Sequence, residues 1–247
     1  MKLISVIYLL TFCFALDGTE LARLMDIRKT PKDSKADLTM VLTNKKGKQR
    51  TSTIRSFSKD GGEKQITWFL APADDKGVGF LKIEHDSKDD EMRMWLPAFK
   101  KVRRISAGKK SDSFMGSDMS YEDMASRQID EFDFTITGEQ DINGVLCKIL
   151  ESKPKESVQS EYSRHLSWVH PEKHITLQEH SFDKSGNLLK EKKYAYTVIK
   201  EYDILQEITV TNVLKNHSTR LTFSNMDLDT GIPDSQFHEK YLKRLPK

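Results

Sequence analysis

Cysteine is nearly absent from this chain. Only two of its 247 residues are cysteines, Cys13 and Cys147. Because Cys13 lies in an apolar segment that we expect to be removed, Cys147 would have no partner in the mature protein. This excludes a small fold held together by disulfide bonds, and we expect Cys147 to lie in a strand as a small hydrophobic residue.

Long hydrophobic runs are equally scarce. The one clear run covers residues 3–14, follows a single positive residue, Lys2, and precedes the small residue Ala15. A positive start, a short apolar stretch and a small residue at the end are typical of a secretory signal, and the run is too short to span a bilayer comfortably. We therefore predict a signal peptide over residues 1–15, cleaved near Ala15, and export to the periplasm.

The rest of the chain, residues 16–247, is expected to form one domain, since it contains no repeat and no low-complexity linker. A lipid anchor at Cys13 is not expected, because bulky Phe12 precedes it where a lipoprotein signal has a small residue. We expect the mature protein to be a monomer.

Neither sign of charge dominates. One of the 40 Lys and Arg residues is Lys2, so 39 remain in the mature chain against 37 Asp and Glu. This balance argues against a nucleic-acid partner. The hydrophobic fraction of 37%, beside 31% charged residues, is low for a protein with a thick closed core. It is nevertheless too high for a disordered chain. Such a composition favours a single curved sheet with one solvent-exposed face.

Most of the chain has the residue pattern of short β-strands. Leu38, Met40 and Leu42 alternate with polar residues, and turn signals such as Asp60-Gly61-Gly62 separate the segments. Short connections between strands predict an antiparallel meander. The predicted strands cover residues 36–43, 50–58, 64–70, 79–84, 91–96, 101–106, 132–139, 145–152, 162–169, 175–182, 188–200, 204–213 and 218–228.

Two segments lack this strand pattern. Residues 17–29 place Leu21, Leu24 and Met25 on one face of a helix. Residues 111–127 are apolar without alternation and contain Ser120-x-x-Asp123, a sequence typical of a capping box, which predicts a second helix.

A sheet of ten or more strands curls strongly, and its concave face must be filled by side chains, helices or a ligand. Both helical segments are rich in Leu and Met, whose soft side chains suit variable apolar ligands. Two interpretations stay open: the helices border a ligand cavity, or they simply plug the core.

The sequence also resembles a known family, the periplasmic LolA-like proteins called outer-membrane lipoprotein-sorting proteins. It resembles in particular the branch often encoded beside lipid exporters of the resistance-nodulation-division type. The resemblance runs from about residue 17 to 242. The matching segments are residues 43–50, 69–81, 95–105 (with LPAFKKVRRI), 113–124 (SFMGSDMSYEDM) and 231–237.

This resemblance implies a mainly β fold: an unclosed, strongly curved antiparallel barrel wrapped around two or three short helices, with an apolar cavity between them. From this cavity we expect a carrier of lipid or lipoprotein acyl chains that works with an inner-membrane exporter of the resistance-nodulation-division type. The residues expected to line the cavity lie on helical apolar faces or in the matching strands; they are Leu21, Leu24, Met25, Phe69, Phe80, Leu81, Trp95, Phe114, Met115, Met119 and Met124.

A basic run, Lys100, Lys101, Arg103 and Arg104, has two readings. It could be the wet face of a strand, or it could dock to anionic lipid head groups or to a transporter. Each surface cation contributes only ~1 kcal/mol near an anionic membrane. Extracting an ordinary acyl chain costs more than ~10 kcal/mol at ~0.8 kcal/mol per CH₂. The run can therefore orient the protein, but only an apolar cavity can hold the cargo.

No catalytic or metal-ligating arrangement is visible. His165, His170, His174 and His180 lack a fixed ligand spacing. We expect no enzyme activity and no cofactor. The alternative to a carrier is a periplasmic adaptor or lipid-state sensor that carries nothing and regulates a transporter or an envelope-stress partner.

Overall fold

A computed structural model describes residues 16–85, 88 and 90–246. The predicted signal peptide lies outside these residues. All thirteen predicted strands are present and form one antiparallel sheet, which confirms the mainly β fold. The strands are β1 (Asp33–Thr43), β2 (Gln49–Lys59), β3 (Lys64–Ala71), β4 (Gly79–Ile83), β5 (Glu91–Leu96), β6 (Lys101–Arg104), β7 (Phe132–Ile142), β8 (Val145–Pro154), β9 (Tyr162–Val169), β10 (Thr176–Asp183), β11 (Leu188–Ile199), β12 (Tyr202–Asn212) and β13 (His217–Leu228).

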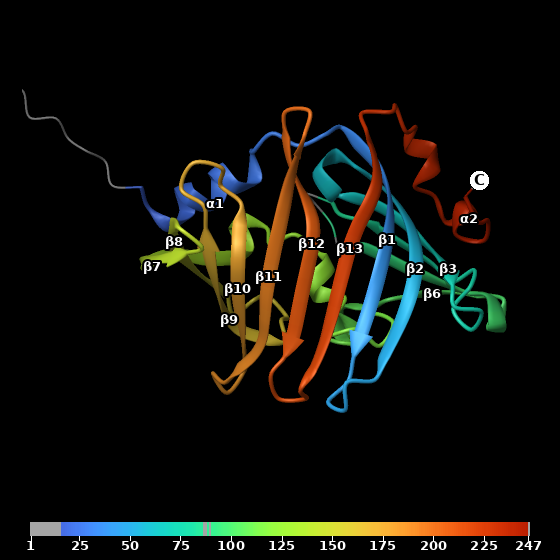
Figure 1. Cartoon of the computed structure of the whole chain (residues 1–247), viewed down its shortest axis with the longest axis horizontal. Helices are drawn as coiled ribbons and strands as arrows, with labels where there is room; N and C mark the ends of the chain where they lie inside the picture. Colours follow the sequence, from blue (N-terminus) through green and yellow to red (C-terminus); the bar gives the residue numbers. More distant parts are fainter. Residues whose placement is uncertain (1–15, 86–87, 89, 247) are drawn as a thin grey trace, which may run out of the picture.

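The first and last strands meet at the centre of the sheet. The order is β6-β5-β4-β3-β2-β1-β13-β12-β11-β10-β9-β8-β7, so two meanders are joined through the β1–β13 pair. Figure 1 shows this pair in the middle, with one meander on each side. The edge strands β6 and β7 do not pair with each other, and the curved sheet stays unclosed.

Alternation along the strands separates the two faces of the sheet. On the concave face Leu38, Met40 and Leu42 of β1 are buried, and Ile54 of β2 pairs with Phe69 of β3. On the convex face Trp68 packs edge to face against Phe57, with ring centroids 5.2 Å apart. Each face therefore carries its own apolar cluster.

Helix α1 (Gly18–Asp26) packs on the concave face beside β7 and β8. The Asp17 carboxylate caps it by accepting a hydrogen bond from the Glu20 N–H at 2.8 Å. Leu21 is fully buried against Leu150 of β8. A side chain at Gly18 would lie 2.5 Å from the backbone of β7, so only glycine allows this approach. The helix predicted over residues 17–29 is confirmed, with an earlier end.

The C-terminal segment covers the convex face. A 3₁₀ turn (Asp234–Gln236) and helix α2 (Glu239–Leu242) follow β13, and Figure 1 shows α2 outside the sheet beside β3. Phe237 and Leu242 pack on Trp68, whose indole N–H donates to the Tyr241 carbonyl at 3.0 Å. Gly79 permits the contact, since a Cβ there would lie 2.6 Å from the Leu242 carbonyl oxygen.

Residues 105–131 form a segment that we call the strap; it joins the two meanders and crosses the concave face. The helix predicted within residues 111–127 is wrong: the strap holds only the 3₁₀ turns Ala107–Lys109, Glu122–Met124 and Ile129–Glu131. The capping box itself forms, because Asp123 accepts from the Ser120 N–H at 2.8 Å. The helix does not continue, because side chains of the strap are bonded to several different strands.

Two further 3₁₀ turns, Asp60–Gly62 and Pro97–Phe99, connect strands. No helix among the described residues is long and apolar enough to cross a membrane.

Candidate functional site

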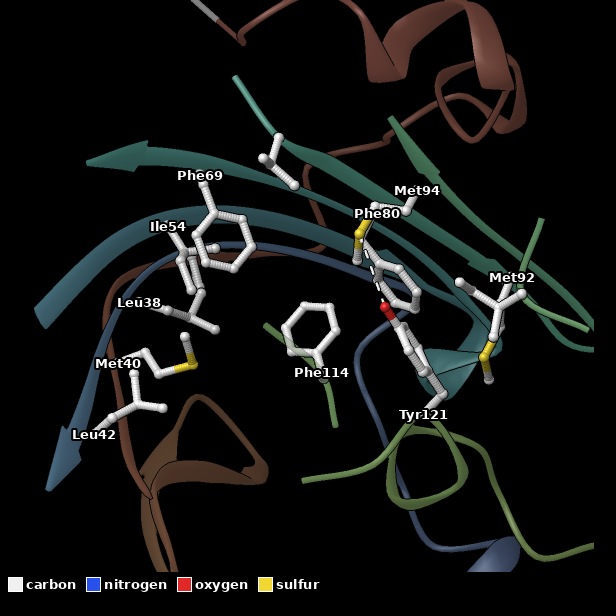
Figure 2. Close-up of a cluster of buried hydrophobic side chains, with 13 residues drawn as sticks. Leu38, Met40, Leu42, Ile54, Phe69, Phe80, Met92, Met94, Phe114 and Tyr121 are labelled. Atoms are coloured by element: carbon white, nitrogen blue, oxygen red, sulfur yellow. Dashed lines mark hydrogen bonds between the residues drawn. The ribbon is translucent and has the colours of Figure 1, made fainter. Parts of the chain in front are cut away.

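Phe114 of the strap lies at the centre of the apolar half of the concave face. Figure 2 shows its ring between Phe69 and the β1 side chains on one side and Phe80 and Tyr121 on the other. Its ring centroid is 5.1 Å from that of Phe80 and 6.0 Å from that of Phe69. The Tyr121 hydroxyl contacts the Met94 sulfur at 3.8 Å.

This half of the interior is tightly filled. Phe69 and Phe80 are fully buried and Phe114 is 3% exposed. Met115 and Met124 pack against the same cluster, while Met119 is buried in the turn where the Phe114 N–H donates to its carbonyl. The strap therefore occupies the place where the sequence predicted a ligand.

The remaining predicted cavity residues do not share one lining. Leu21 and Met25 belong to the α1 cluster, and Leu24 is half-buried on α1 outside it. Leu81 and Trp95 pack on the convex face against the C-terminal segment. Their expected place beside Phe80 is wrong, since Leu81 follows Phe80 directly and successive residues of a strand point to opposite faces. Whether the other residues contact lipid stays a prediction.

A small hollow with one apolar side, which faces polar residues such as Ser56, Ser58 and Gln65, remains open on the concave face. It has a volume of about 270 Å³ and lies beneath the connection between α1 and β1, residues 28–31. Phe223 and Met226 of β13 border it and also pack against the Phe114 cluster, so the hollow continues the apolar half of the interior. Its other apolar lining residues are Ala36, Ile204, Leu205 and Leu228.

The opposite half of the concave face carries a buried ionic network. Asp123 of the strap accepts from Lys190 at 2.8 Å and from Lys192 at 2.6 Å, both on β11. Glu179 of β10 accepts from Lys192 at 2.9 Å and from both terminal nitrogens of Arg127 at 2.7 and 2.8 Å. These ion pairs bind the strap to the sheet.

The network keeps its carboxylates ionised. Burial opposes the charge on Asp123, but Lys192 and Lys190 outweigh it and hold the pKa of this carboxyl well below its usual range. Burial likewise opposes ionisation of Glu179, but Arg127 and Lys192 hold its pKa well below the ordinary value. The strap is thus held by charges that persist at neutral pH.

The strap is also bonded to the other meander and to the central strands. Lys82 of β4 pairs with Glu84 and donates to the Met124 carbonyl at 2.9 Å. Asp118 accepts from the Thr219 hydroxyl of β13 at 2.7 Å, and His217 lies 2.7 Å from the same carboxylate. The strap therefore connects both halves of the concave face.

Between the ionic network, the strap and α1 lies a cavity with a volume of about 600 Å³. Met25 of α1 borders it, and Tyr194 of β11 and Ser152 of β8 form part of its floor beside the ionic network. This cavity is largely polar, which differs from the apolar cavity that the resemblance implied.

Sequence patterns do not predict this network. Lys190, Lys192 and Tyr194 alternate along β11, but the same pattern is expected when charged residues face water. The Nδ1 atom of His165 lies 2.9 Å from the Ser181 hydroxyl at the edge of the network. Among the described residues, no group of three or more His, Cys, Asp or Glu is arranged to hold a metal ion.

The four predicted docking cations lie at the open edge of the sheet. Lys100, Lys101, Arg103 and Arg104 are exposed on or beside β6 and have no ion-pair partner among the described residues. Phe99, directly before them, is 70% exposed. This group of five residues is called the basic edge below.

A family model described as "Uncharacterized protein" matches residues 61–244. A crystal structure of a candidate outer membrane lipoprotein-sorting protein domain from Vibrio parahaemolyticus is 30% identical, covers 92% of this chain and 98% of its own, and superposes with a TM-score of 0.86. The chain belongs to the family of this lipoprotein-sorting protein domain.

A DUF1329 family protein from Desulfovibrio piger ATCC 29098 is 31% identical, with 91% of this chain and 97% of that chain covered and a TM-score of 0.85. A LolA superfamily protein from Nitrosomonas europaea shares the fold at 19% identity and a TM-score of 0.72, over 92% of this chain and 100% of its own. The comparison with curated proteins gives no match.

Proposed function

We propose that this LolA-like protein is a periplasmic carrier that binds an amphipathic lipid, or the acyl chain of a lipoprotein, on the concave face of its sheet. The observation that carries the proposal is the hollow of about 270 Å³ between residues 28–31 and β13. Its apolar side is continuous with the Phe114 cluster through Phe223 and Met226, so an acyl chain entering here would pack against that side.

The hollow is too small to hold a whole acyl chain in this structure. Ligand pockets usually measure roughly 300–1,000 Å³, and this one lies just below that range. A whole acyl chain would therefore extend toward Phe114, and the strap would move to admit it. Burial of the chain would stabilise the complex by ~0.8 kcal/mol per CH₂, which is enough to displace part of a packed segment.

The test is binding of an acyl chain by the purified protein. Native mass spectrometry after gentle purification should show bound lipid, and a fluorescent fatty acid should be taken up. Met226→Glu places a carboxylate in the hollow and should weaken uptake at least tenfold, since an apolar chain would have to bury that charge. No co-purified lipid together with no uptake would contradict the carrier function.

A matched control is available in Leu214→Glu. Leu214 is 63% exposed in the turn after β12 and lies outside the hollow. This variant makes the same chemical change and should leave uptake unaltered. Equal loss in both variants would show that the effect of Met226→Glu does not arise from the hollow.

The basic edge supports a second part of the proposal, docking to the membrane or to an inner-membrane exporter of the resistance-nodulation-division type. Unpaired cations beside an exposed aromatic ring suit an anionic lipid surface. Charge reversal of Lys101 and Arg103 to Glu should abolish binding to vesicles that contain phosphatidylglycerol without affecting fatty-acid uptake. Unchanged vesicle binding would contradict a role of the basic edge in docking to the membrane.

The tight packing around Phe114 favours one alternative function. A protein with a filled interior could act as a periplasmic adaptor or lipid-state sensor that carries nothing. In that case the protein would bind its transporter or envelope-stress partner with no lipid present, and Met226→Glu would leave this binding unchanged.

A further inference from the structure

Strand β6 leaves main-chain groups open at the edge of the sheet. Within the described part of the chain it pairs only with β5, and Figure 1 shows β6 and β7 at opposite sides of the molecule. The Ile105 N–H donates to the Met92 carbonyl of β5 at 2.9 Å. Bonded and non-bonded pairs alternate along an antiparallel ladder, so Arg103 also bonds to β5, whereas the N–H and C=O groups of Val102 and Arg104 point away from it. These outward groups have no hydrogen-bond partner among the residues that the structure describes.

The side chains along this open edge are mostly cationic. Cross-strand pairing with β5 places Lys101 and Arg103 on the concave side and Val102 and Arg104 on the convex side. On the convex side, the ammonium of Lys243 lies 5.3 Å from the centroid of the indole ring of β5. None of these cations forms an ion pair within the described ranges. A segment that carries carboxylates would therefore meet unpaired charges on both sides of the edge.

An apolar groove lies beside these cations. Leu96, Phe99 and Val102 line it together with Lys101 and Arg103. Phe99 is 70% exposed, so its ring is available to a partner. Sheet edges that recognise extended peptides combine main-chain hydrogen bonds with pockets for alternate side chains. The open edge at β6 has both features.

Charge also decides between the possible occupants of this edge. Two β6 strands from two copies would bring Lys101, Arg103 and Arg104 against the same cations, and like charges across a strand pair are destabilising. Lysine and arginine on an edge strand thus discourage self-association. The occupant that suits this edge is an acidic segment of a different protein.

We propose that β6 binds an extended acidic segment of a partner protein, which adds to the sheet as a further antiparallel strand. Carboxylates on one face of the segment would pair with Lys101 and Arg103. Apolar residues on its other face would bond to the main chain of Val102 and Arg104. The inference rests on the docking role proposed for the basic edge and commits that docking to a protein partner.

The probe is a blocked hexapeptide of alternating glutamate and valine, titrated into the mature protein and followed by nuclear magnetic resonance of the backbone amides. The amide signals of Val102 and Arg104 should shift. A hexapeptide with glutamine in place of glutamate should bind about threefold more weakly or worse, because exposed ion pairs are lost. Added salt should weaken binding of the glutamate peptide for the same reason.

N-methylation of the peptide tests the main-chain bonds on the unmodified protein. In antiparallel pairing the valines share the convex side with Val102, so their N–H groups donate to β6 and those of the glutamates point outward. Methyl groups on the valine nitrogens should weaken binding at least about tenfold, since each main-chain hydrogen bond corresponds to a factor of about two to ten in affinity. Methyl groups on the glutamate nitrogens are the matched control and should leave binding nearly unchanged. Equal effects of the two peptides would overturn strand addition.

Val102→Pro tests the same bonds from the side of the protein. It removes an outward N–H, breaks no bond to β5 and keeps every cation, and proline is tolerated on an edge strand in this orientation. Binding of the hexapeptide should weaken by a factor of about two to ten. Val102→Thr keeps the N–H and should bind the hexapeptide as the wild type does.

The outcomes separate this inference from the proposed function. If the hexapeptide shifts neither amide while vesicles with phosphatidylglycerol still bind, strand addition is refuted and docking to the membrane stands. If the hexapeptide binds with the expected dependence on N-methylation while neither vesicles nor the fatty acid bind, strand addition stands and the membrane and carrier parts of the proposed function are refuted. Self-association in analytical ultracentrifugation that Val102→Pro abolishes would make the occupant a second copy and overturn the acidic partner.

Discussion

At the residue scale, Phe114 is the side chain whose removal tests the packed interior most directly. It is 3% exposed and contacts Phe69, Phe80 and Tyr121. Phe114→Ala should destabilise the protein by roughly 3–5 kcal/mol, because the lost ring leaves a cavity in a rigid cluster. Urea unfolding followed by circular dichroism measures the change.

The control for this substitution is Phe99→Ala, which removes the same ring from a 70% exposed position. Its effect on the free energy of unfolding should stay within about 0.5 kcal/mol. Similar, small losses in both variants would mean that Phe114 does not fill the interior.

His165 gives the network a pH dependence. Burial, together with Arg127, disfavours the imidazolium and holds the pKa of His165 well below its ordinary value. The unfolded chain therefore takes up this proton at a higher pH than the folded protein does. Stability should be unaffected by His165 above about pH 6.5 and should decrease below it, by at most ~1.4 kcal/mol per pH unit.

The measurement is the free energy of unfolding of the wild type and of His165→Gln at pH 7.5, 6.5 and 5.5. The wild type should lose stability relative to the variant only across the two lower values. His180, whose pKa burial also lowers, is present in both proteins, so its effect cancels. Parallel curves would contradict a neutral buried His165.

At the scale of elements, the strap should depend on its ion pairs. Asp123→Ala leaves Lys190 and Lys192 without their shared carboxylate, and breaking such a buried network typically costs roughly 3–5 kcal/mol. Amide hydrogen exchange should accelerate over residues 111–127, while the paired amides of β1 and β13 stay protected.

Asp112→Ala is the matched control, because Asp112 lies on the same strap with an exposed side chain that pairs, within the described part of the chain, only with Lys109 at 3.6 Å. Its exchange pattern should equal that of the wild type. If Asp123→Ala instead accelerated exchange evenly through the sheet, the strap would not be an independently opening element.

The strands could be predicted because their signals are local. Alternation such as Leu38, Met40, Leu42 and turns such as Asp60-Gly61-Gly62 depend on neighbours in the sequence. The strap could not, since its conformation is set by distant partners: Asp118 is bonded to Thr219, and Asp123 to Lys190. The capping box of the strap forms, but a capping box favours only the first turn of a helix. The bonds from the strap to distant strands prevent the helix from continuing.

The same reasoning explains the errors in the candidate site. A strand pattern shows that two sets of side chains face opposite ways, yet not which set faces inward. Leu81 and Trp95 therefore lie on the face opposite to the expected one, and the pattern alone does not reveal that Lys190 and Lys192 are buried.

At the scale of the whole molecule, the convex face depends on its C-terminal cover. Truncation after Gly231 removes Ile232, Phe237 and Leu242 and should expose the apolar patch around Trp68. Increased binding of 8-anilinonaphthalene-1-sulfonate and self-association in analytical ultracentrifugation are expected. Truncation after Arg244 keeps Leu242 and should behave like the full chain; equal behaviour of the two truncations would contradict a structural role for the cover.

The pairing of β1 with β13 joins the two meanders, and this step comes late in folding. Ser34 pairs with Leu228, and the Asp33 carboxylate accepts from the Thr230 N–H at 2.8 Å, across 197 positions of the chain. Each meander can begin to form from nearby contacts, but the two can be joined only after nearly the entire polypeptide has been synthesised. Contacts over such separations make folding slow. A nascent chain thus passes through a long period with its two half-sheets unconnected, and the enclosed space that cargo would need arises in the last step.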